Sequence, residues 1–384
     1  MHRSICDFGV RPNGSPEANR QCLQDGIDWA TECGGSLWVA PSDTPWPVAA
    51  GLRLRANASL VGAHGPVGRG TRHPRAPRPV GSVFAITGTD QPFVTVESST
   101  QLRGLQLWYP EQPVDDVAAI VEYPPTVQVA QDENVYGVTL SCLTFFGEFF
   151  ALDFRSCGDH INEQILVEHC YGYPLSGRFV HVDRCYDIPR LLHCHVNPAN
   201  RRLMEGQYSR EVIDSVMGRG TYAYQIDHTD NAQCMDLFTF GTYGGARLGP
   251  ATYGQLTNFN FDCVTVGLHK SGDSPFNRNW QLAQGSIIAN AGPRLEDVHP
   301  LIIDGQGHTA VTNVEAFSGP NGALSTLDRS WDYAYIGGDE VLTASFFGCR
   351  MRDYTADDPL TITSASARVR AVACFDREQQ VYER

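Results

Sequence analysis

The sequence predicts an all-β fold: a right-handed parallel β-helix solenoid with an N-terminal capping helix. Short β-rich runs recur at intervals of about 20–30 residues, which is a spacing typical of solenoid coils. The composition also favours strands and turns, because Gly, Val, Thr, Asn, Phe and Tyr are plentiful and long Leu/Glu/Lys/Ala stretches are missing. With 384 residues and 42% hydrophobic content, the chain can bury a large core.

The first structural element we expect is a helix from about Glu17 to Cys33. Leu23, Ile27 and Ala30 fall on one face of this helix and give it an apolar stripe. Gly34 follows directly and is typical of a helix end. A helix of this kind can cover the open end of a solenoid, which would otherwise expose a row of core side chains.

Three short segments surround this helix. Asp7-Phe8-Gly9-Val10 precedes it, the segment Gly34–Pro41 follows it, and Leu60-Val61-Gly62 ends a later strand-like run. Together they resemble the N-terminal signature of the pectate-lyase-like β-helix superfamily, although Ser15–Ala18 stands where family members often carry an acidic T-D-D-T run. The resemblance implies a right-handed parallel β-helix for this chain.

We expect one continuous β-helix domain. Residues 1–65 would form the cap and first coils, and residues 66–384 the remainder with groove-forming loops. Loops are predicted at 66–82, 199–220 and 270–280, since loops that leave a β-helix build the walls of its groove. A β-sandwich is the competing fold, and it is disfavoured because few two-residue hairpin turns join neighbouring strands.

Charge and targeting signals limit the partners. The formal net charge of −14 would repel nucleic acid and anionic membranes, so we expect neither as a partner. No run is long and apolar enough to span a bilayer, and the first residues lack the apolar core of a signal peptide. The protein is therefore expected to be cytoplasmic as written, or secreted if a signal peptide was trimmed from it.

The twelve cysteines are scattered and lack C-x-x-C pairs. We expect them to be mostly reduced and buried, and we expect neither a metal site nor another cofactor. By analogy with β-helix enzymes that pack side by side, a homotrimer is the expected assembly.

A second set of motifs lies between Leu105 and Asp230. They are Leu107–Gln112, Tyr171–Leu175, Asp183–Ile188, His195–Pro198 and Ile226–Asp230. These motifs resemble a group of predicted glycoside-hydrolase-like β-helix proteins. The resemblance implies a carbohydrate-active enzyme with a polysaccharide or oligosaccharide substrate, and it names no particular glycan.

Glycoside hydrolysis needs two carboxyl groups that flank one bond. We expect the catalytic carboxylates among Glu111, Asp230, Asp153, Asp187 and Asp227. Glu111 follows an aromatic pair, and Asp230 ends a polar run shortly before an aromatic strand. The competing interpretation is structural, because Asp at solenoid turns usually caps backbone groups.

The residues expected to bind the substrate are Trp108, Tyr109, Arg155, His195 and Tyr243. Aromatic rings such as Trp108 and Tyr109 can stack on sugar faces, and they can equally pack in a core or under a loop. His195 can hydrogen-bond a substrate in a groove. A metal site built from His195, His193 and His169 is the weaker interpretation, because no second ligand pair stands at a suitable spacing.

Hydrolysis is the reaction that the abundant carboxylates favour. A lyase that acts on uronates would need a base such as Arg, Lys, His or Tyr, and Arg155, Arg178 and Arg184 keep this reaction open. The sequence is also compatible with a fructan-type transferase and with a non-catalytic carbohydrate-binding solenoid. Release of reducing ends would favour the hydrolase, and a new double bond that absorbs ultraviolet light would favour the lyase. Glycan binding without either product would favour the non-catalytic module.

Overall fold

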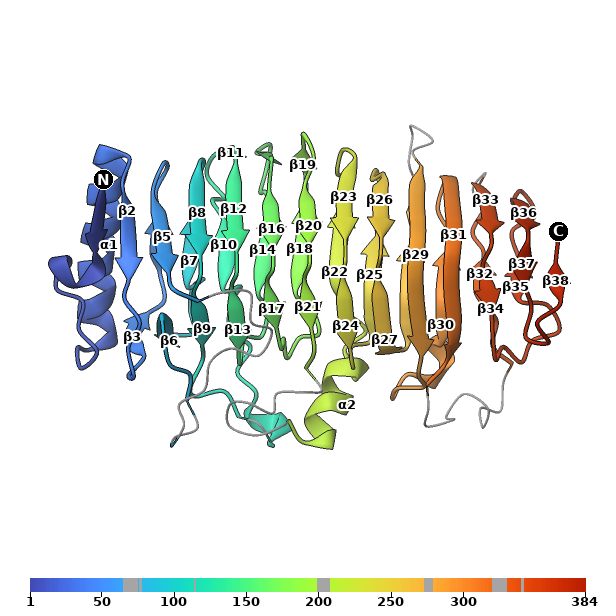
Figure 1. Ribbon diagram of the computed structural model, residues 1–384, viewed down its shortest axis with the longest axis horizontal. Coiled ribbons are helices and arrows are strands. Elements are labelled where there is room, and N and C mark those ends of the chain that lie inside the picture. Colours follow the sequence, from blue (N-terminus) through green and yellow to red (C-terminus); the bar gives the residue numbers. More distant parts are fainter. Residues whose placement is uncertain are drawn as a thin grey trace. The chain divides into compact units, whose positions relative to one another are not determined.

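The computed structural model describes residues 1–64, 75, 78–113, 115–198, 208–272, 279–319, 330–339 and 342–384. The chain divides into two compact units, Met1–Ile213 and Asp214–Arg384. Each unit is built from short strands that pair in parallel with the equivalent strands of the next coil (Figure 1). The predicted parallel β-helix with an N-terminal helix is confirmed. The prediction that residues 1–65 and 66–384 belong to one continuous domain stays a prediction.

The N-terminal helix forms where the sequence predicts it. Helix α1 spans Pro16–Cys33, and the hydroxyl of Ser15 caps its first turn by accepting a hydrogen bond from the Ala18 amide. Gly34 ends the helix in the left-handed region at φ 59°, a conformation that glycine adopts without strain. Leu23, Ile27 and Ala30 are buried, so the predicted apolar face is the face that packs. A short 3₁₀ helix, η1 (Ile5–Phe8), precedes α1.

The first unit contains three parallel sheets. Two rows of strands form the first sheet: β1 (His2–Ser4), β2 (Ser36–Val39), β5 (Ser59–Gly62), β8 (Thr100–Arg103), β12 (Val138–Ser141), β16 (Leu166–Glu168) and β20 (Arg190–Leu192), and then β3 (Trp46–Ala49), β6 (Val83–Thr87), β9 (Gln106–Trp108), β13 (Thr144–Phe146), β17 (Tyr171–Gly172) and β21 (His195–Val196). The second sheet contains β4 (Leu52–Leu54), β7 (Val94–Val96), β10 (Val127–Val129), β14 (Leu152–Arg155) and β18 (Val180–Asp183). The third contains β11 (Val135–Tyr136), β15 (Asn162–Glu163) and β19 (Cys185–Tyr186).

In its described residues, the second unit repeats the arrangement of the first two of these sheets. One sheet contains β22 (Tyr222–Asp227), β25 (Gly244–Leu248), β28 (Val266–Lys270), β30 (His299–Ile303), β32 (Ala334–Ile336) and β35 (Leu360–Ile362). The facing rows contain β23 (Ala232–Met235), β24 (Phe238–Phe240), β26 (Gly254–Thr257), β27 (Asn260–Val264), β29 (Trp280–Ala289), β31 (Gly307–Ser318), β33 (Leu342–Phe347), β34 (Arg350–Met351), β36 (Arg368–Val372) and β37 (Cys374–Phe375). Strand β38 (Val381–Tyr382) pairs with β37 in the antiparallel sense and ends the ladder.

Several coils bend at a single residue with positive φ. In the first unit, Cys142, His169 and His193 occupy equivalent bends between the two rows of strands, with φ between 51° and 54°. Because equivalent positions in neighbouring coils lie about 4.8 Å apart, side chains at such bends stack. The rings of His169 and His193 do so, with centroids 4.7 Å apart and planes nearly parallel. Their positions are therefore explained by the coil geometry.

Alternation of side chains places the core between the sheets. Leu152 and Phe154 on β14 are completely buried, whereas Arg155 on the other face is partly exposed. All twelve cysteines lie in the described part of the chain; none forms a disulfide, and seven are buried. The expectation of free thiols that are mostly buried agrees with this arrangement.

The loop prediction for 199–220 is wrong in its second half. Helix α2 spans Arg210–Gly218, and the Ser209 hydroxyl accepts a hydrogen bond from the Val212 amide at its start. The apolar pairs Val212-Ile213 and Val216-Met217 recur at helical spacing, which is the signal that indicates this helix. Residues 199–207 and 273–278, and most of the predicted loop at 66–82, lie outside the described residues. Two further 3₁₀ helices, η2 (Val117–Ala119) and η3 (Leu295–Asp297), are short, and no helix in the described ranges is long and apolar enough to cross a membrane.

Candidate functional site

The candidate site lies on the second unit, on the sheet formed by β22, β25, β28 and β30. Gln225, Arg247 and His269 occupy equivalent positions on the first three of these strands and form a row of polar side chains. They alternate with core residues, because Leu248 and Leu268 beside them are almost fully buried. The parallel register therefore places a guanidinium next to an imidazole, on strands about 4.8 Å apart.

A chain of hydrogen bonds runs through His269. Its Nδ1 lies 3.1 Å from the hydroxyl of Tyr222, and its Nε2 lies 3.0 Å from a carboxylate oxygen of Asp304. Because a carboxylate only accepts hydrogen bonds, Nε2 carries the proton and Nδ1 accepts from the Tyr222 hydroxyl. A hydroxyl, an imidazole and a carboxylate in this order can pass a proton along the chain. The imidazole side chain is 21% exposed, so the chain lies close to solvent.

Packing explains why Tyr222 reaches His269. Its ring lies over Gly244, where a side-chain Cβ would come within 2.2 Å of a ring carbon. Tyr243 packs edge-on against the ring at 5.6 Å, and Val266 belongs to the same apolar cluster. Burial, followed by the neighbouring Tyr243, raises the pKa of Tyr222 above its ordinary value. The hydroxyl therefore remains protonated at neutral pH and acts as a donor towards His269.

Arg247 has an unusual environment for a half-buried cation. Its Nε donates one hydrogen bond, to the Ser271 hydroxyl at 3.3 Å. No carboxylate in the described part of the chain forms an ion pair with it. A half-buried guanidinium is normally paired, because it matches a carboxylate or phosphate with two parallel hydrogen bonds. Arg247 is therefore available for an anionic group beside His269.

A carboxylate and a guanidinium support the aromatic side of the cluster. The Tyr243 hydroxyl donates to Asp297 at 2.9 Å, and the Arg294 Nε donates to the same carboxylate at 2.6 Å. The Arg294 guanidinium also lies over the Tyr243 ring, 5.4 Å from its centroid. These contacts fix Tyr243, and Tyr243 in turn holds the Tyr222 ring in place.

The same sheet carries a second pair of histidine and carboxylate. His299 Nδ1 lies 3.0 Å from Asp332, and its ring packs against Tyr335 with centroids 5.3 Å apart. In the contacts of the described residues no hydroxyl bonds its other ring nitrogen. The pair is a useful reference, because it lacks the hydrogen bond from a tyrosine that His269 accepts.

The predicted catalytic carboxylates lie in several places. Asp153 on β14 is buried and forms two short hydrogen bonds with the Arg155 guanidinium, at 2.7 Å each. Asp187 follows β19 in a left-handed turn and accepts from Gln164 at 2.6 Å. Asp153 is thus neutralised internally, and the position of Asp187 fits the structural role of an aspartate at a solenoid turn.

The other three predicted catalytic carboxylates also lie in different surroundings from one another. Asp227 ends β22 and accepts from Gln225 at 2.7 Å, while Asp230 accepts from the Tyr253 hydroxyl. Glu111 lies exposed on the loop after β9, and its charge adds to burial, the larger cause, in raising the pKa of Tyr123. Asp227 and Asp230 thus have hydrogen-bond donors different from those of Asp153 and Asp187, and no two of these four carboxylates share a donor. Asp227 is the one nearest to the candidate site, through Gln225.

Two of the predicted sugar platforms lie in the interior. Tyr109 is 2% exposed and donates to the Thr126 hydroxyl at 3.0 Å, so neither face of its ring is open to a sugar. Trp108 on β9 is also buried, at 9% exposure. The prediction that sugars stack on these two rings is therefore wrong. Both rings pack in the core, which was the competing interpretation.

The remaining substrate-binding predictions have different outcomes. Arg155 is held by Asp153, and His195 on β21 lies 5.9 Å from the Tyr171 ring. Tyr243 is the one that belongs to the candidate site, against Tyr222. No group of three or more metal-ligating side chains occurs in the described ranges. A metal site at His169, His193 and His195 gains no support, since two of these rings stack in coil bends.

The residues that carry the candidate site were missed because no local motif marks them. Tyr222, Arg247, His269 and Asp304 come from four segments, and each is an ordinary residue in its own strand or loop. One signal was present: Gln225, Arg247 and His269 are equally spaced along the sequence. Equal spacing by one coil predicts stacking in a solenoid, and it would have placed the arginine beside the histidine.

The fold and these contacts define the class of protein: a parallel β-helix with a hydrogen-bonded tyrosine, histidine and carboxylate beside an arginine on one sheet. No protein-family model matches the sequence, and no significant match is found among curated proteins. The resemblance to pectate-lyase-like β-helix proteins is confirmed for the fold.

Solved structures give the particular similarities. The pre-mature gene product 12 of bacteriophage phi29 is 11% identical, with a TM-score of 0.53 over 97% of this chain and 52% of that chain. Its N-terminal fragment is 9% identical, with a TM-score of 0.52 over 97% of this chain and 66% of that chain. This chain therefore spans about half of the longer structure. The A-module of Azotobacter vinelandii mannuronan C-5 epimerase AlgE6 is 12% identical, with a TM-score of 0.47 over 96% of this chain and 97% of that chain. At these identities the similarities concern the fold alone.

Proposed function

We propose that this protein is a carbohydrate-active enzyme that cleaves an acidic polysaccharide or oligosaccharide by elimination. The observation that carries the proposal is the hydrogen-bonded chain from Tyr222 through His269 to Asp304, beside an Arg247 that no described carboxylate pairs. A proton-transfer chain next to an available guanidinium suits a substrate that carries both a carboxylate and an acidic C–H bond.

Arg247 has the role of binding the carboxylate of a uronate unit. A guanidinium binds a carboxylate through two parallel hydrogen bonds and neutralises its charge. Neutralisation makes the hydrogen on the adjacent ring carbon easier to remove, because the electron pair left behind is stabilised. His269 occupies the equivalent position on the next strand and hydrogen-bonds the Tyr222 hydroxyl, so the Tyr222 oxygen that accepts the proton would lie close to that carbon.

Residues of the cluster both accept the substrate proton and return a proton to the leaving group. The Tyr222 oxygen takes the proton from the carbon next to the carboxylate while its own proton moves to Nδ1 of His269, and Asp304 stabilises the imidazolium. A double bond then forms in the sugar ring as the glycosidic carbon–oxygen bond breaks. The leaving oxygen takes a proton from Tyr222, and His269 returns its proton to Tyr222. The raised pKa of Tyr222 favours this relay over a standing tyrosinate.

A carbohydrate substrate is supported by the resemblance of the sequence to glycoside-hydrolase-like β-helix proteins. Hydrolysis, the reaction that the abundant carboxylates favour, needs two carboxyl groups on either side of one bond. Asp153, Asp187 and Asp230 each have a hydrogen-bond donor of their own, which does not support such a pair. Elimination is therefore placed first and hydrolysis second.

The proposal is tested on the full chain with a panel of polyuronates and neutral polysaccharides. Ultraviolet absorbance follows the unsaturated product, and a reducing-end assay follows cleavage of any kind. Activity on a polyuronate with growing absorbance is the expected result. Tyr222→Phe and His269→Gln should each lower kcat by a factor on the order of 10²–10⁴, as expected for loss of a general acid or base.

The matched control is His299→Gln. This change removes a histidine that also contacts a carboxylate on the same sheet, and it should keep activity within about threefold of the unchanged protein. Reducing ends without ultraviolet absorbance would establish hydrolysis and overturn elimination. Binding of a glycan without any cleavage would establish a non-catalytic module. Equal losses in His269→Gln and His299→Gln would show that the Tyr222 link has no special role.

A further inference from the structure

A second surface of interest lies on the three-stranded sheet of the first unit. Strands β11 and β19 lie at the upper edge of Figure 1, and β15 pairs with both. Val135, Asn162 and Cys185 point inward on these strands and are completely buried. The alternate positions point outward and carry Tyr136, Glu163 and Tyr186 in register.

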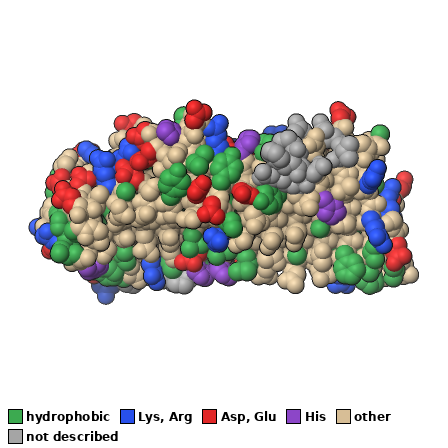
Figure 2. Space-filling model, turned by 90° about the horizontal axis from the view of Figure 1, so that it is seen from above, with side chains coloured by type: hydrophobic (Ala, Val, Ile, Leu, Met, Phe, Trp, Pro, Cys, Tyr) green, Lys and Arg blue, Asp and Glu red, His purple; other side chains and the backbone are tan. Residues whose placement is uncertain are grey.

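The three outward side chains are not used by the fold. Tyr136 is 40% exposed and Tyr186 37%, which places them with the few large hydrophobic side chains that are exposed. In the contacts of the described residues, neither phenol ring packs against another ring. Their hydroxyls and the Glu163 carboxylate also form no hydrogen bond or ion pair there. Figure 2, which shows the molecule from above, has hydrophobic and acidic side chains side by side on this face.

The spacing of the two rings follows from the parallel register. Tyr136 and Tyr186 occupy equivalent positions two coils apart, so their Cα atoms are on the order of 10 Å from one another. That separation is comparable with the length of a disaccharide unit. Glu163 lies midway and can accept hydrogen bonds from hydroxyl groups. Two flat rings with an acceptor between them match a chain of sugar rings with its hydroxyls turned inward.

The charge of the surface selects the kind of sugar. Asp187 follows Tyr186 and is held by Gln164, so a second carboxylate flanks the row. Two carboxylates without a nearby ion pair would repel a uronate. A protein interface is also disfavoured, because a charged residue rarely occupies the centre of one.

We propose that Tyr136, Glu163 and Tyr186 form a binding surface for a neutral oligosaccharide. This surface is separate from the Arg247 cluster and does not depend on the elimination reaction. The sugar rings stack on the two phenol rings, and Glu163 accepts hydrogen bonds from hydroxyls of the unit between them.

Affinity electrophoresis of the full chain tests the surface. Native gels contain dextran, galactomannan, hydroxyethyl cellulose or arabinoxylan, and one control gel contains polygalacturonate. Retardation in at least one neutral gel is expected. The double variant Tyr136→Ala, Tyr186→Ala should bind that polysaccharide about tenfold or more weakly, since each ring contributes stacking and apolar contact. Phe347→Ala with Phe375→Ala is the matched control, because these rings are also exposed and lie elsewhere in the chain.

The outcomes separate this proposal from its competitors. Retardation that the tyrosine variant loses and the phenylalanine variant keeps supports a neutral-saccharide surface. No retardation in any neutral gel, or retardation that the tyrosine variant keeps, overturns it. Tyrosine-dependent retardation by polygalacturonate alone overturns the neutral class. A change from oligomer to monomer in sedimentation of the tyrosine variant identifies a protein interface instead. Ultraviolet assays of elimination are unaffected by any of these results, so the two proposals fail separately.

Discussion

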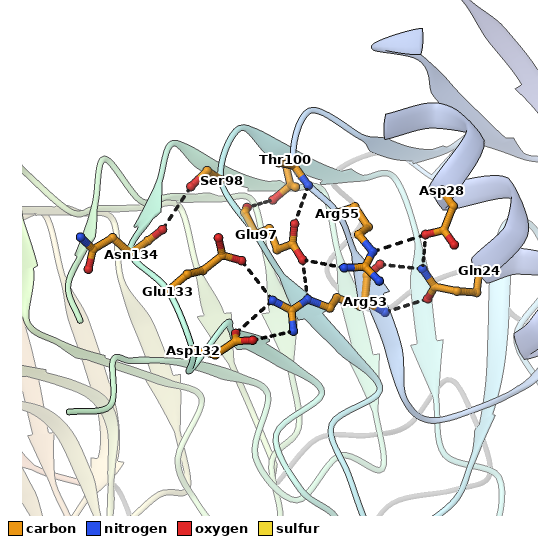
Figure 3. Close-up of polar contacts among 11 residues, drawn as sticks. Gln24, Asp28, Arg53, Arg55, Glu97, Ser98, Thr100, Asp132, Glu133 and Asn134 are labelled. Atoms are coloured by element: carbon orange, nitrogen blue, oxygen red, sulfur yellow. Dashed lines mark hydrogen bonds and ion pairs between the residues drawn. The ribbon is translucent and has the colours of Figure 1, made fainter. Parts of the chain in front are cut away.

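Arg53 and Arg247 are arginines on short parallel strands of the two units, and they have opposite surroundings. Arg53 on β4 contacts three carboxylates: Glu97, Asp132 at 3.0 Å and Glu133 at 3.1 Å (Figure 3). The hydrogen bond with Asp132 raises the pKa of Arg53. Arg247 on β25 contacts the hydroxyl of Ser271 and no carboxylate of the described residues. One guanidinium is neutralised by the protein itself, and the other is not.

The difference separates two uses of charge on one fold. At the first coils the charges join elements: Arg55 contacts Asp28 of α1 as well as Glu97, which ties the helix to the strands beside it (Figure 3). A half-buried charge without a partner is costly to hold, because it loses water without gaining an ion pair. Arg247 bears that cost next to His269, where an anionic ligand would offset it.

The largest effect is expected from Arg247→Gln. If Arg247 binds a substrate carboxylate, kcat/KM on a polyuronate should fall by a factor on the order of 10²–10³, as for loss of a strong electrostatic contact in an active site. The melting temperature should change little, since no ion pair is broken. Steady-state kinetics and thermal unfolding measure the two quantities. A fall in stability with unchanged kinetics would mean that Arg247 has a structural role, like Arg53, and does not bind the substrate.

Arg53→Met should show the opposite pattern. Glu97, whose side chain is 10% exposed, would keep only Arg55 and the Ala56 amide as partners. We expect a loss of about 2 kcal/mol in the free energy of unfolding, less than for a fully buried pair because Arg53 is one-third exposed. Chemical denaturation measures this loss. Kinetics on the polyuronate should be unchanged, and Arg55→Met, which loses two ion pairs of 3.5 Å, should cost less.

Gly244→Ala probes the support of the proton-transfer chain with one methyl group. The new Cβ would meet the Tyr222 ring, so the ring must move away from β25 and the hydroxyl away from His269. Overpacking of this kind costs about 1–3 kcal/mol. Activity should fall with stability here, unlike in Arg247→Gln. Unchanged activity in a stably folded Gly244→Ala protein would mean that the Tyr222–His269 contact is not required.

The fold could be predicted because its signals are local and repeated. The apolar face of α1, the stop at Gly34 and the alternating strands each depend on neighbours in sequence, and the structure confirms them. Helix α2 was missed because it is only nine residues long and its apolar residues are two pairs, Val212-Ile213 and Val216-Met217. In so short a helix the apolar periodicity repeats only once or twice, which does not distinguish the helix from a loop.

The candidate site could not be predicted in the same way. A carboxylate in a motif attracts attention, yet Asp153 turns out to be bound by Arg155 two residues later on the same strand. Arg247, by contrast, is functional in our proposal because of what it lacks, and the absence of a partner cannot be seen from residue type. The spacing of 22 residues between Arg247 and His269 hints at their stacking, and the register shows that the two lie together.

The smallest effect we expect concerns the attachment of α1. Gln24 accepts a hydrogen bond from the Arg53 amide at 2.9 Å and donates one to the Arg53 carbonyl at 3.0 Å, so one side chain satisfies both backbone groups of a β4 residue (Figure 3). It also donates to Asp28 four residues later. Gln21 makes the equivalent bond to Asp25, and in the contacts of the described residues it forms no hydrogen bond with β4, which makes it the matched control.

Gln24→Ala should therefore cost about 1–2 kcal/mol, for two hydrogen bonds to a partly buried backbone. Gln21→Ala should cost only about 0.2–0.5 kcal/mol, the usual value of an exposed pair four residues apart on a helix. Urea denaturation of the two variants measures both. Hydrogen exchange at the Arg53 amide should also be faster in Gln24→Ala and unchanged in Gln21→Ala, because only the first loses an acceptor. Equal losses of stability would mean that α1 is held by its apolar face alone. The polar contacts at the first coils would then add nothing measurable to the attachment of the cap.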